Sequence, residues 1–118
     1  RFFGGINFLK STINKNKIET EIGPINYKQK NMNELSSNHL LTIRPENIEI
    51  SKTNAFKENY FSGTVTSIIF SGTNTRYKVK VKDTVLDCSV QSVGLKDISQ
   101  NDEVFVHLPA EKIWGMND

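Results

Sequence analysis

The chain has 118 residues, of which 15 are basic and 13 are acidic, so its formal net charge is +2. This length suits one domain with an ordinary hydrophobic core, and the near balance of charge argues against a protein drawn to nucleic acid or anionic membranes by its overall field. Its single cysteine, Cys88, excludes an internal disulfide and fits a reducing compartment. No apolar run reaches the ~20 residues that span a bilayer.

The first part of the chain predicts a hairpin of short strands. Apolar residues within 6–9 indicate a first strand, and the polar residues 14–17 are a plausible hairpin tip. Residues 18–22 alternate between apolar and polar side chains, as a half-buried strand does. We expect Gly23-Pro24 to close that strand, because proline cannot donate to a sheet ladder.

A polar stretch and a proline separate the next two predicted strands. Residues 28–38 are rich in Asn and Ser and predict a loop or a frayed helical turn. A short apolar strand is expected over 39–43, and alternation resumes at Ile48. Between these strands Pro45 should hold Arg44 in an extended conformation.

The segment 60–71 predicts a long strand that bends. Val65 lies on one face and Ile68 on the other, so the inward-facing set changes between them. Gly63 sits just upstream, and a bulge or glycine corner of this kind lets one strand serve two sides of a small barrel. Residues 71–74 then supply a turn into the next strand.

Regular alternation follows in the rest of the chain. Residues 76–82, 86–90 and 103–108 each alternate between apolar and polar positions, with Asp83-Thr84 as a turn and Pro109 as a stop. The order of a long bent strand, a hairpin and further strands predicts an all-β fold: a small antiparallel OB-like barrel, with an additional β subdomain from the N-terminal part.

The sequence predicts neither catalytic residues nor a cofactor or metal site in this chain. A Gly-x-x-x-x-Gly-Lys-Ser/Thr loop is missing, so nothing here can cradle ATP phosphates. His39 and His107 have no Cys or His at metal-ligand spacing. Cys88 occupies an inward strand position, where a small buried hydrophobe is a better interpretation than a reactive thiol.

A basic stripe leaves a nucleic-acid alternative open. Arg76, Lys78, Lys80 and Lys82 share one strand face, and OB barrels bind single strands with charged grooves and stacking aromatics. Tyr77 points to the opposite face, however, and a solvated sheet face gives the same pattern. We therefore favour the solvated face and expect no nucleic-acid partner.

Several phrases together resemble one family. In order they are similar to the transport-associated OB (TOBE) domain of ABC importer ATPases, and among these the spermidine/putrescine importer ATPases are the most similar. Asn101 stands where the family usually has glycine, and asparagine tolerates the left-handed turn expected there. The phrases are Phe2–Leu9, Leu41–Ile48 with its Arg-Pro-Glu step, Gly63–Val65, Phe70–Gly72, Tyr77–Val81, Asp102–Val106, Pro109–Glu111 and Ile113-Trp114.

The resemblance implies a non-catalytic regulatory and dimerisation domain of an importer ATPase, and it implies polyamines (spermidine and putrescine) as the substrates of the importer. It divides the chain into 1–38, an N-terminal β segment with a polar loop, and 39–118, the TOBE/OB-like barrel. The nucleotide-binding domain is then absent, and the start at Arg1 looks like an excision from a longer protein. Some TOBE domains bind a small oxyanion, which gives a further alternative.

The same resemblance implies the surroundings of the domain. ATP and Mg would belong to the parent chain, and no cofactor to this part of it. The expected partners are the upstream nucleotide-binding domain, a second ATPase subunit in a homodimer, and the membrane permease subunits. The location would be cytoplasmic, at the inner face of the cell membrane through the transporter complex.

Four residues are candidate interface or regulatory positions. Arg44 and Glu46 flank the rigid Pro45 and are interpreted either as an inter-domain or inter-subunit ion pair or as a solvated pair worth ~0–1 kcal/mol. Trp114 is a large apolar surface that we expect to pack as a lid on the barrel rather than to serve as a ligand platform. Phe2, Phe3 and Phe8 should cover a domain junction or fold onto the barrel.

Overall fold

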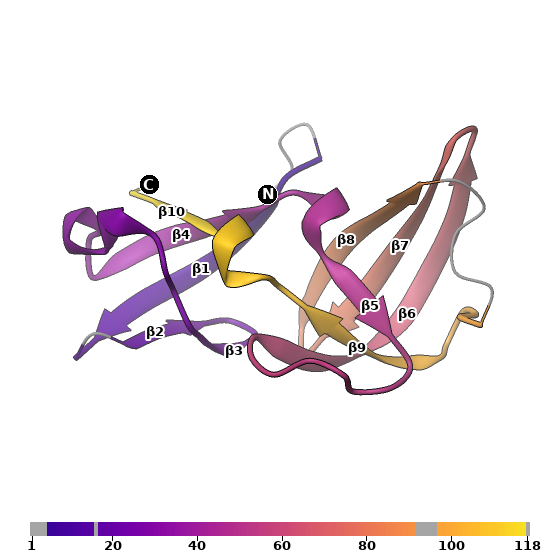
Figure 1. Ribbon diagram of the computed structural model, residues 1–118, viewed down its shortest axis with the longest axis horizontal. Helices are drawn as coiled ribbons and strands as arrows, with labels where there is room; N and C mark the ends of the chain where they lie inside the picture. Colours follow the sequence, from indigo (N-terminus) through magenta and orange to yellow (C-terminus); the bar gives the residue numbers. More distant parts are fainter. Residues whose placement is uncertain (1–4, 16, 92–96, 118) are drawn as a thin grey trace.

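The computed structural model describes residues 5–15, 17–91 and 97–117. Its described residues form two antiparallel sheets that lie side by side along the long axis of a molecule measuring 41 × 28 × 23 Å (Figure 1). The first sheet has the strand order β10-β4-β1-β2-β3, and the second has the order β5-β9-β6-β7-β8. The strands are β1 (Asn7–Asn14), β2 (Lys17–Thr20), β3 (Gly23–Ile25), β4 (Asn38–Ile43), β5 (Glu49–Ser51), β6 (Tyr60–Ser71), β7 (Asn74–Val81), β8 (Thr84–Gln91), β9 (Glu103–His107) and β10 (Trp114–Met116), with 3-10 turns η1 (Lys30–Glu34), η2 (Pro45–Asn47) and η3 (Ala110–Lys112). The all-β prediction is confirmed.

The first sheet is centred on β1, which pairs with β2 on one side and β4 on the other. Leu9 lies opposite Leu41, and both are buried against the core. Ser11 and His39 form the next inward-facing pair and are also buried. Alternation therefore sends one face of these strands into the core and the other to solvent, as the sequence pattern predicted.

The last strand of the chain completes this first sheet. β10 returns from the second sheet and pairs with β4 (Figure 1). Its outer edge is covered, because the Gly115 N–H donates to the Tyr27 hydroxyl at 2.9 Å and the Gly115 carbonyl accepts from Asn31 Nδ2 at 3.0 Å. A Cβ at Gly115 would lie 2.8 Å from Leu35 Cδ1, so a larger residue there would require the Leu35 side chain to move.

The second sheet is built around the bent strand β6. Its register against β7 shifts between Val65 and Ser67, which confirms the predicted change of face. Gly63 lets the strands approach closely: a Cβ there would lie 2.8 Å from Val79 Cγ1 and 2.9 Å from the Lys80 carbonyl oxygen. The tight turn into β7 uses Gly72 at φ +62°, a conformation that glycine adopts without strain.

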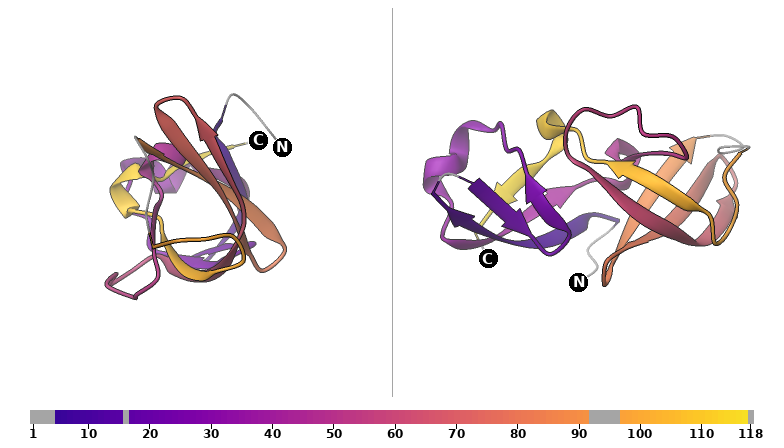
Figure 2. Two further views of the ribbon diagram at one scale, coloured as in Figure 1. Left: turned by 90° about the vertical axis from the view of Figure 1, so that its right-hand side faces the viewer. Right: turned by 90° about the horizontal axis from the view of Figure 1, so that it is seen from below.

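Side chains join the two sheets into one body. The Asn7 side chain at the start of β1 donates to the Asp87 carbonyl at 2.9 Å and accepts from the Asp87 N–H at 2.8 Å. Asn59 makes a similar reciprocal pair with the backbone of Asn26, at 2.8 and 3.0 Å. The buried apolar side chains of both sheets form one continuous cluster. The sheets therefore share a core, and the view from below shows a single elongated body (Figure 2, right).

Most local predictions hold, and two need correction. The polar stretch 28–38 contains the turn η1, and Asn101 adopts the left-handed conformation at φ +73°. Gly23-Pro24 was expected to close the strand over 18–22, but β2 already ends at Thr20 and Gly23-Pro24 opens the next strand, β3. Pro24 sits there on an edge strand, where its missing N–H has no cost. Trp114 is not a buried lid, because it is 50% exposed on the edge strand β10 of the first sheet.

The division of the chain into an N-terminal segment (1–38) and a barrel (39–118) stays a prediction. In the structure, β4 and β10 from the proposed barrel part lie in the same sheet as β1, β2 and β3. The phenylalanines at positions 2 and 3 lie outside the described residues, and Phe8 is half-buried on β1. No helix in the described ranges is both long and apolar enough to cross a bilayer.

Candidate functional site

A polar groove of about 870 Å³ runs along the free edge of β8. We call it the β8 groove. Its floor comes from the neighbouring strands β7 and β8, and its wall comes from the Arg-Pro-Glu step, which leads into and forms most of η2, and from the start of β5. η2, which forms part of the wall, lies beside β8 near the place where the second sheet meets the first (Figure 1). The lining residues are Gly5, Arg44, Pro45, Glu46, Ile48, Glu49, Ile50, Asn74, Arg76, Ser89, Val90 and Gln91.

The edge of β8 offers backbone donors to this groove. Asp87 directs its N–H and C=O away from β7, because both bond to the Asn7 side chain. Residues two apart on an antiparallel strand point their backbone groups the same way, so the Ser89 N–H also points outward. In the described part of the chain this N–H has no hydrogen-bond partner. Asn7 therefore caps one part of the edge and leaves the next part open.

Two guanidinium groups line the groove. Arg44 comes just before η2 and is extended at φ −76° and ψ 147°, as the following Pro45 requires. Arg76 is half-buried on the outer face of β7, directly opposite Ser89. Its side chain reaches toward Gly5, where an added Cβ would lie 3.8 Å from Arg76 Nη2. Among the described residues neither guanidinium makes an ion pair or hydrogen bond.

Two carboxylates share the groove with these cations. Glu46 belongs to η2 and Glu49 begins β5, and both side chains are exposed. The formal charges of the four ionisable groups therefore cancel. Within the described ranges, neither carboxylate pairs with Arg44 or Arg76. The groove thus presents separate donors and acceptors to a ligand, rather than ion pairs already closed on themselves.

The predicted residues are only partly brought together. Arg44, Pro45 and Glu46 line the β8 groove, whereas Trp114 lies on the other sheet and does not. Arg44 and Glu46 do not pair with each other within the described residues, and an ion pair of either with another domain or subunit stays a prediction. From the sequence, Arg76 was noted as part of the basic stripe of β7, but that stripe was interpreted as a solvated face and not as part of a binding site. Nothing in the sequence indicated that the edge of β8 would line the groove, because this depends on how distant strands pair.

The rest of the stripe behaves as a solvated sheet face. Lys78 forms a cross-strand ion pair with Asp87 at 3.0 Å. Lys80 and Lys82 are exposed, and Lys82 sits in the turn at φ +56°. Cross-strand pairs of opposite charge are a common way to stabilise an antiparallel face. Only Arg76 of the four cations lines the β8 groove.

Cys88 lies beside the groove wall but offers no reactive thiol. Its Sγ donates to the Ile48 carbonyl at 3.0 Å, and the side chain is buried. Burial, and secondly the nearby Glu49 carboxylate, raise the pKa of the thiol to about 12. A thiol with such a pKa carries little thiolate at neutral pH, so the small-hydrophobe interpretation holds.

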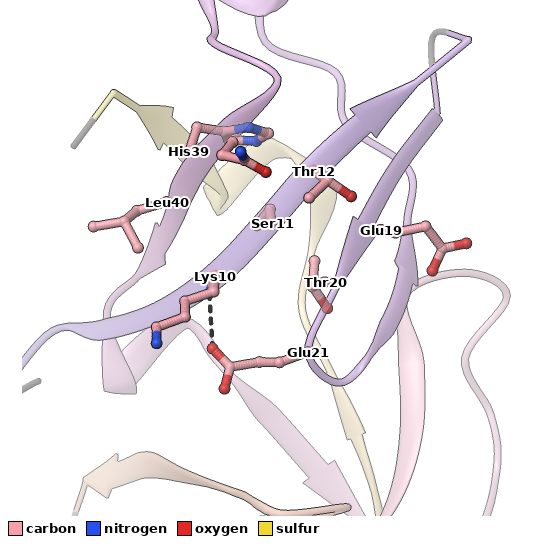
Figure 3. A pocket seen from close by; sticks show the side chains of 9 residues that line it. Lys10, Ser11, Thr12, Glu19, Thr20, Glu21, His39 and Leu40 are labelled. Atoms are coloured by element: carbon pink, nitrogen blue, oxygen red, sulfur yellow. Dashed lines mark hydrogen bonds between the residues drawn. The ribbon is translucent and has the colours of Figure 1, made fainter.

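A second concavity lies on the outer face of the first sheet (Figure 3). We call it the outer dish; its volume is about 480 Å³. Its exposed ionisable groups are Lys10, Glu19 and Glu21, and the Lys10 N–H donates to the Glu21 carboxylate at 2.7 Å. Two carboxylates against one ammonium make this site unsuitable for an anion. Nor do the described residues contain a group of three or more metal-ligating side chains.

The fold is that of an OB-like module, and the comparisons with known proteins give its family. A family model described as the TOBE domain matches residues 41–116, more than half of the chain. The chain therefore belongs to the TOBE domain family. A search of curated proteins found no match.

A solved structure with a closely similar fold is the cytoplasmic molybdate-binding protein ModG, crystallised with molybdate bound. The two chains superpose with a TM-score of 0.82 at 10% sequence identity, and the match covers 100% of each. At this identity the likeness concerns the fold alone. It includes the first sheet as well as the part that the family model matches.

Proposed function

We propose that this chain is a non-catalytic TOBE module that binds a small oxyanion in the β8 groove. The observation that carries the proposal is the pair of guanidinium groups, Arg44 and Arg76, that line one groove without partners among the described residues. Arg76 is half-buried and has lost part of its hydration, and an oxyanion restores the missing hydrogen bonds. Arg44 is exposed and adds a second positive charge. The open Ser89 N–H adds a backbone donor, as at other anion-binding sheet edges.

The fold similarity to a molybdate-binding protein supports the same class of ligand. Tetrahedral oxyanions such as molybdate, sulfate and phosphate offer several acceptor oxygens in a compact volume. Arg is suited to them because its planar fork of donors can contact two oxygens at once. The groove is open to solvent, so we expect reversible binding rather than permanent sequestration.

Thermal unfolding with added oxyanions tests this function. A ligand that binds only the folded state stabilises it by about 2.7 kcal/mol at a hundred times its Kd. We expect at least one of molybdate, sulfate and phosphate to raise the Tm of the chain in a saturable way. Chloride at matched ionic strength controls for general screening.

Matched variants localise the effect. Arg76→Gln should abolish most of the Tm increase, whereas Lys80→Gln should keep it, because Lys80 lies on the same strand outside the groove. A flat Tm for the unmodified chain with all three anions would reject the proposed function. If Arg76→Gln and Lys80→Gln lose the Tm increase to the same extent, the anion binds somewhere other than the β8 groove.

A second candidate function is the accessory domain of an ABC importer ATPase. It is favoured by two exposed apolar side chains on β10, Trp114 at 50% and Met116 at 45%, which face the same way on an edge strand. An adjoining domain or subunit would shield such a surface. The expected partners are then an upstream nucleotide-binding domain with ATP and Mg, a second ATPase subunit and membrane permeases. The comparisons give no support to a polyamine as the transported solute.

The coding sequence of the natural gene tests the second candidate function separately from oxyanion binding. If this domain serves an importer ATPase, the coding sequence upstream of Arg1 should contain a phosphate-binding loop. An upstream sequence without one would reject the candidate and leave oxyanion binding untouched.

A further inference from the structure

The β8 groove contains acceptors as well as donors, and this composition restricts the kind of oxyanion that fits. Arg44 and Arg76 supply only donors, whereas ionised Glu46 and Glu49 supply only acceptors. A fully deprotonated anion such as sulfate or molybdate has no proton to give to a carboxylate. It would also meet two negative charges in the same groove.

We propose that the β8 groove selects oxyanions that carry hydroxyl groups, with dihydrogen phosphate as the preferred inorganic form. The ligand's bare oxygens would accept from the guanidinium groups and from the Ser89 N–H. Its hydroxyl groups would donate to the Glu46 and Glu49 carboxylates. This inference rests on the proposed function and names the ligand class of the same site.

The positions of the four groups make this division of roles possible. Arg76 and Ser89 lie directly opposite each other on β7 and β8, so both belong to the floor of the groove. Glu46 lies on η2 and Glu49 on the adjoining start of β5, so the carboxylates belong to its wall. Arg44 comes just before η2 and adds a donor to the wall. A ligand seated between floor and wall therefore meets donors from both sides and acceptors from the wall alone.

Physical chemistry gives the direction of the selectivity. A carboxylate near an anion without a proton repels it, and the same carboxylate attracts an anion that can donate a hydrogen bond. A site built to bond a ligand hydroxyl discriminates strongly against an analogue that lacks it, by up to about 10⁴-fold in enclosed pockets. The β8 groove is open to solvent, so we expect phosphate to bind at least about tenfold more tightly than sulfate or molybdate.

Isothermal titration calorimetry with phosphate, sulfate and molybdate tests the inference on the full chain. Titrations run at matched ionic strength, first below and then above the second pKa of phosphate. We expect phosphate to bind most tightly below that pKa and to weaken above it, since deprotonation removes a donor and adds a negative charge. Sulfate affinity should stay unchanged over the same pH range.

Neutral variants of the wall carboxylates give the second part of the test. Glu46→Gln and Glu49→Gln should each reduce the ratio of phosphate to sulfate affinity, because sulfate is no longer repelled and the amide can donate to it. Glu111→Gln is the matched control, because this exposed glutamate lies outside the groove. Its affinity ratio should equal that of the unmodified chain.

The outcomes separate the inference from the function on which it rests. Binding of all three anions with affinities within about threefold, or tighter binding of sulfate or molybdate, would overturn the inference and leave oxyanion binding intact. An unchanged ratio in both wall variants would also overturn it. No heat of binding for any of the three anions would reject the proposed function itself.

Discussion

Arg76 shows how one residue acquires a role from its neighbours rather than from its own strand. It shares the outer face of β7 with Lys78, yet Lys78 is paired with Asp87 and Arg76 is not paired within the described residues. The difference arises on β8, where Ser89 rather than a carboxylate lies opposite Arg76. Arg76 is therefore an unpaired cation of this face in the described part of the chain, and unlike the exposed Lys80 it lines the β8 groove.

His39 provides a prediction at the residue scale. Its ring is buried with Nδ1 3.1 Å from the Ser36 carbonyl, and Nε2 has no partner among the described residues. Burial lowers the pKa of His39, and the contact with the Ser36 carbonyl opposes this only in part. The folded state therefore favours the neutral ring, which donates from Nδ1.

The sign of the pH effect follows from that pKa. Because the unfolded chain binds the proton more readily, stability is fully present above the ordinary histidine pKa of about 6.5 and falls as pH drops below it. We expect the free energy of unfolding, measured with urea, to decline over this window. His39→Leu should remove this part of the decline, whereas His107→Leu should keep it, because the His107 ring is only half-buried and its Nδ1 contacts the Glu58 carbonyl. An identical pH profile for the unmodified chain and His39→Leu would contradict the prediction.

At the scale of elements, the edge of β8 is the feature that makes the candidate site. Exposed strand edges invite pairing with other chains, and proteins commonly cover or interrupt them. Here the Asn7 side chain covers the edge at Asp87, because it forms the two backbone hydrogen bonds that a neighbouring strand would otherwise form. Beyond it, η2 stands off from the edge and leaves the β8 groove.

Asn7→Ala tests this role. The substitution removes two hydrogen bonds that join β1 to β8, each with a net contribution of about 0.5–1.5 kcal/mol. We expect a loss of roughly 1–3 kcal/mol in the free energy of unfolding, together with faster hydrogen exchange of the Asp87 amide. Asn14→Ala, at an exposed position of the same strand, should change neither. Unchanged exchange at Asp87 in Asn7→Ala would show that the link has no stabilising role.

The elements also show what the sequence could and could not predict. The bend of β6 was predictable, because Val65 and Ile68 change faces over a distance that only a bulge explains. β3 was not, because proline normally argues against a strand and only its edge position makes Pro24 acceptable. The Arg44 side of the groove could be predicted from the Arg-Pro-Glu step, but the Ser89 side depends on pairing between distant strands.

At the scale of the whole molecule, the return of β10 joins the two ends of the fold. The chain enters through the first sheet, builds the second, and comes back to pair with β4 (Figure 1). This long-range pairing could not be derived from local periodicity, and it is why Trp114 was expected on the barrel instead. Shared core packing and the Asn7 and Asn59 links then bind the two sheets together.

Such an arrangement predicts one cooperative unfolding transition. Trp114 is the only tryptophan and reports on the first sheet, whereas far-ultraviolet circular dichroism reports on both sheets. Because neither sheet keeps its core without the other, we expect both signals to give the same urea midpoint. A fluorescence midpoint clearly below the dichroism midpoint would mean that the sheets unfold as separate units.

The most direct test of oxyanion binding in the β8 groove is to map the bound anion by nuclear magnetic resonance. ¹⁵N-labelled protein would be titrated separately with phosphate and with molybdate, following the backbone amides and the arginine Nε–H groups. We predict saturable shifts centred on the Ser89 amide and on the side chains of Arg44 and Arg76, with the outer dish unaffected. Absence of any saturable shift at these three residues with both anions, or shifts confined to Lys10 and its neighbours in the outer dish, would contradict the account.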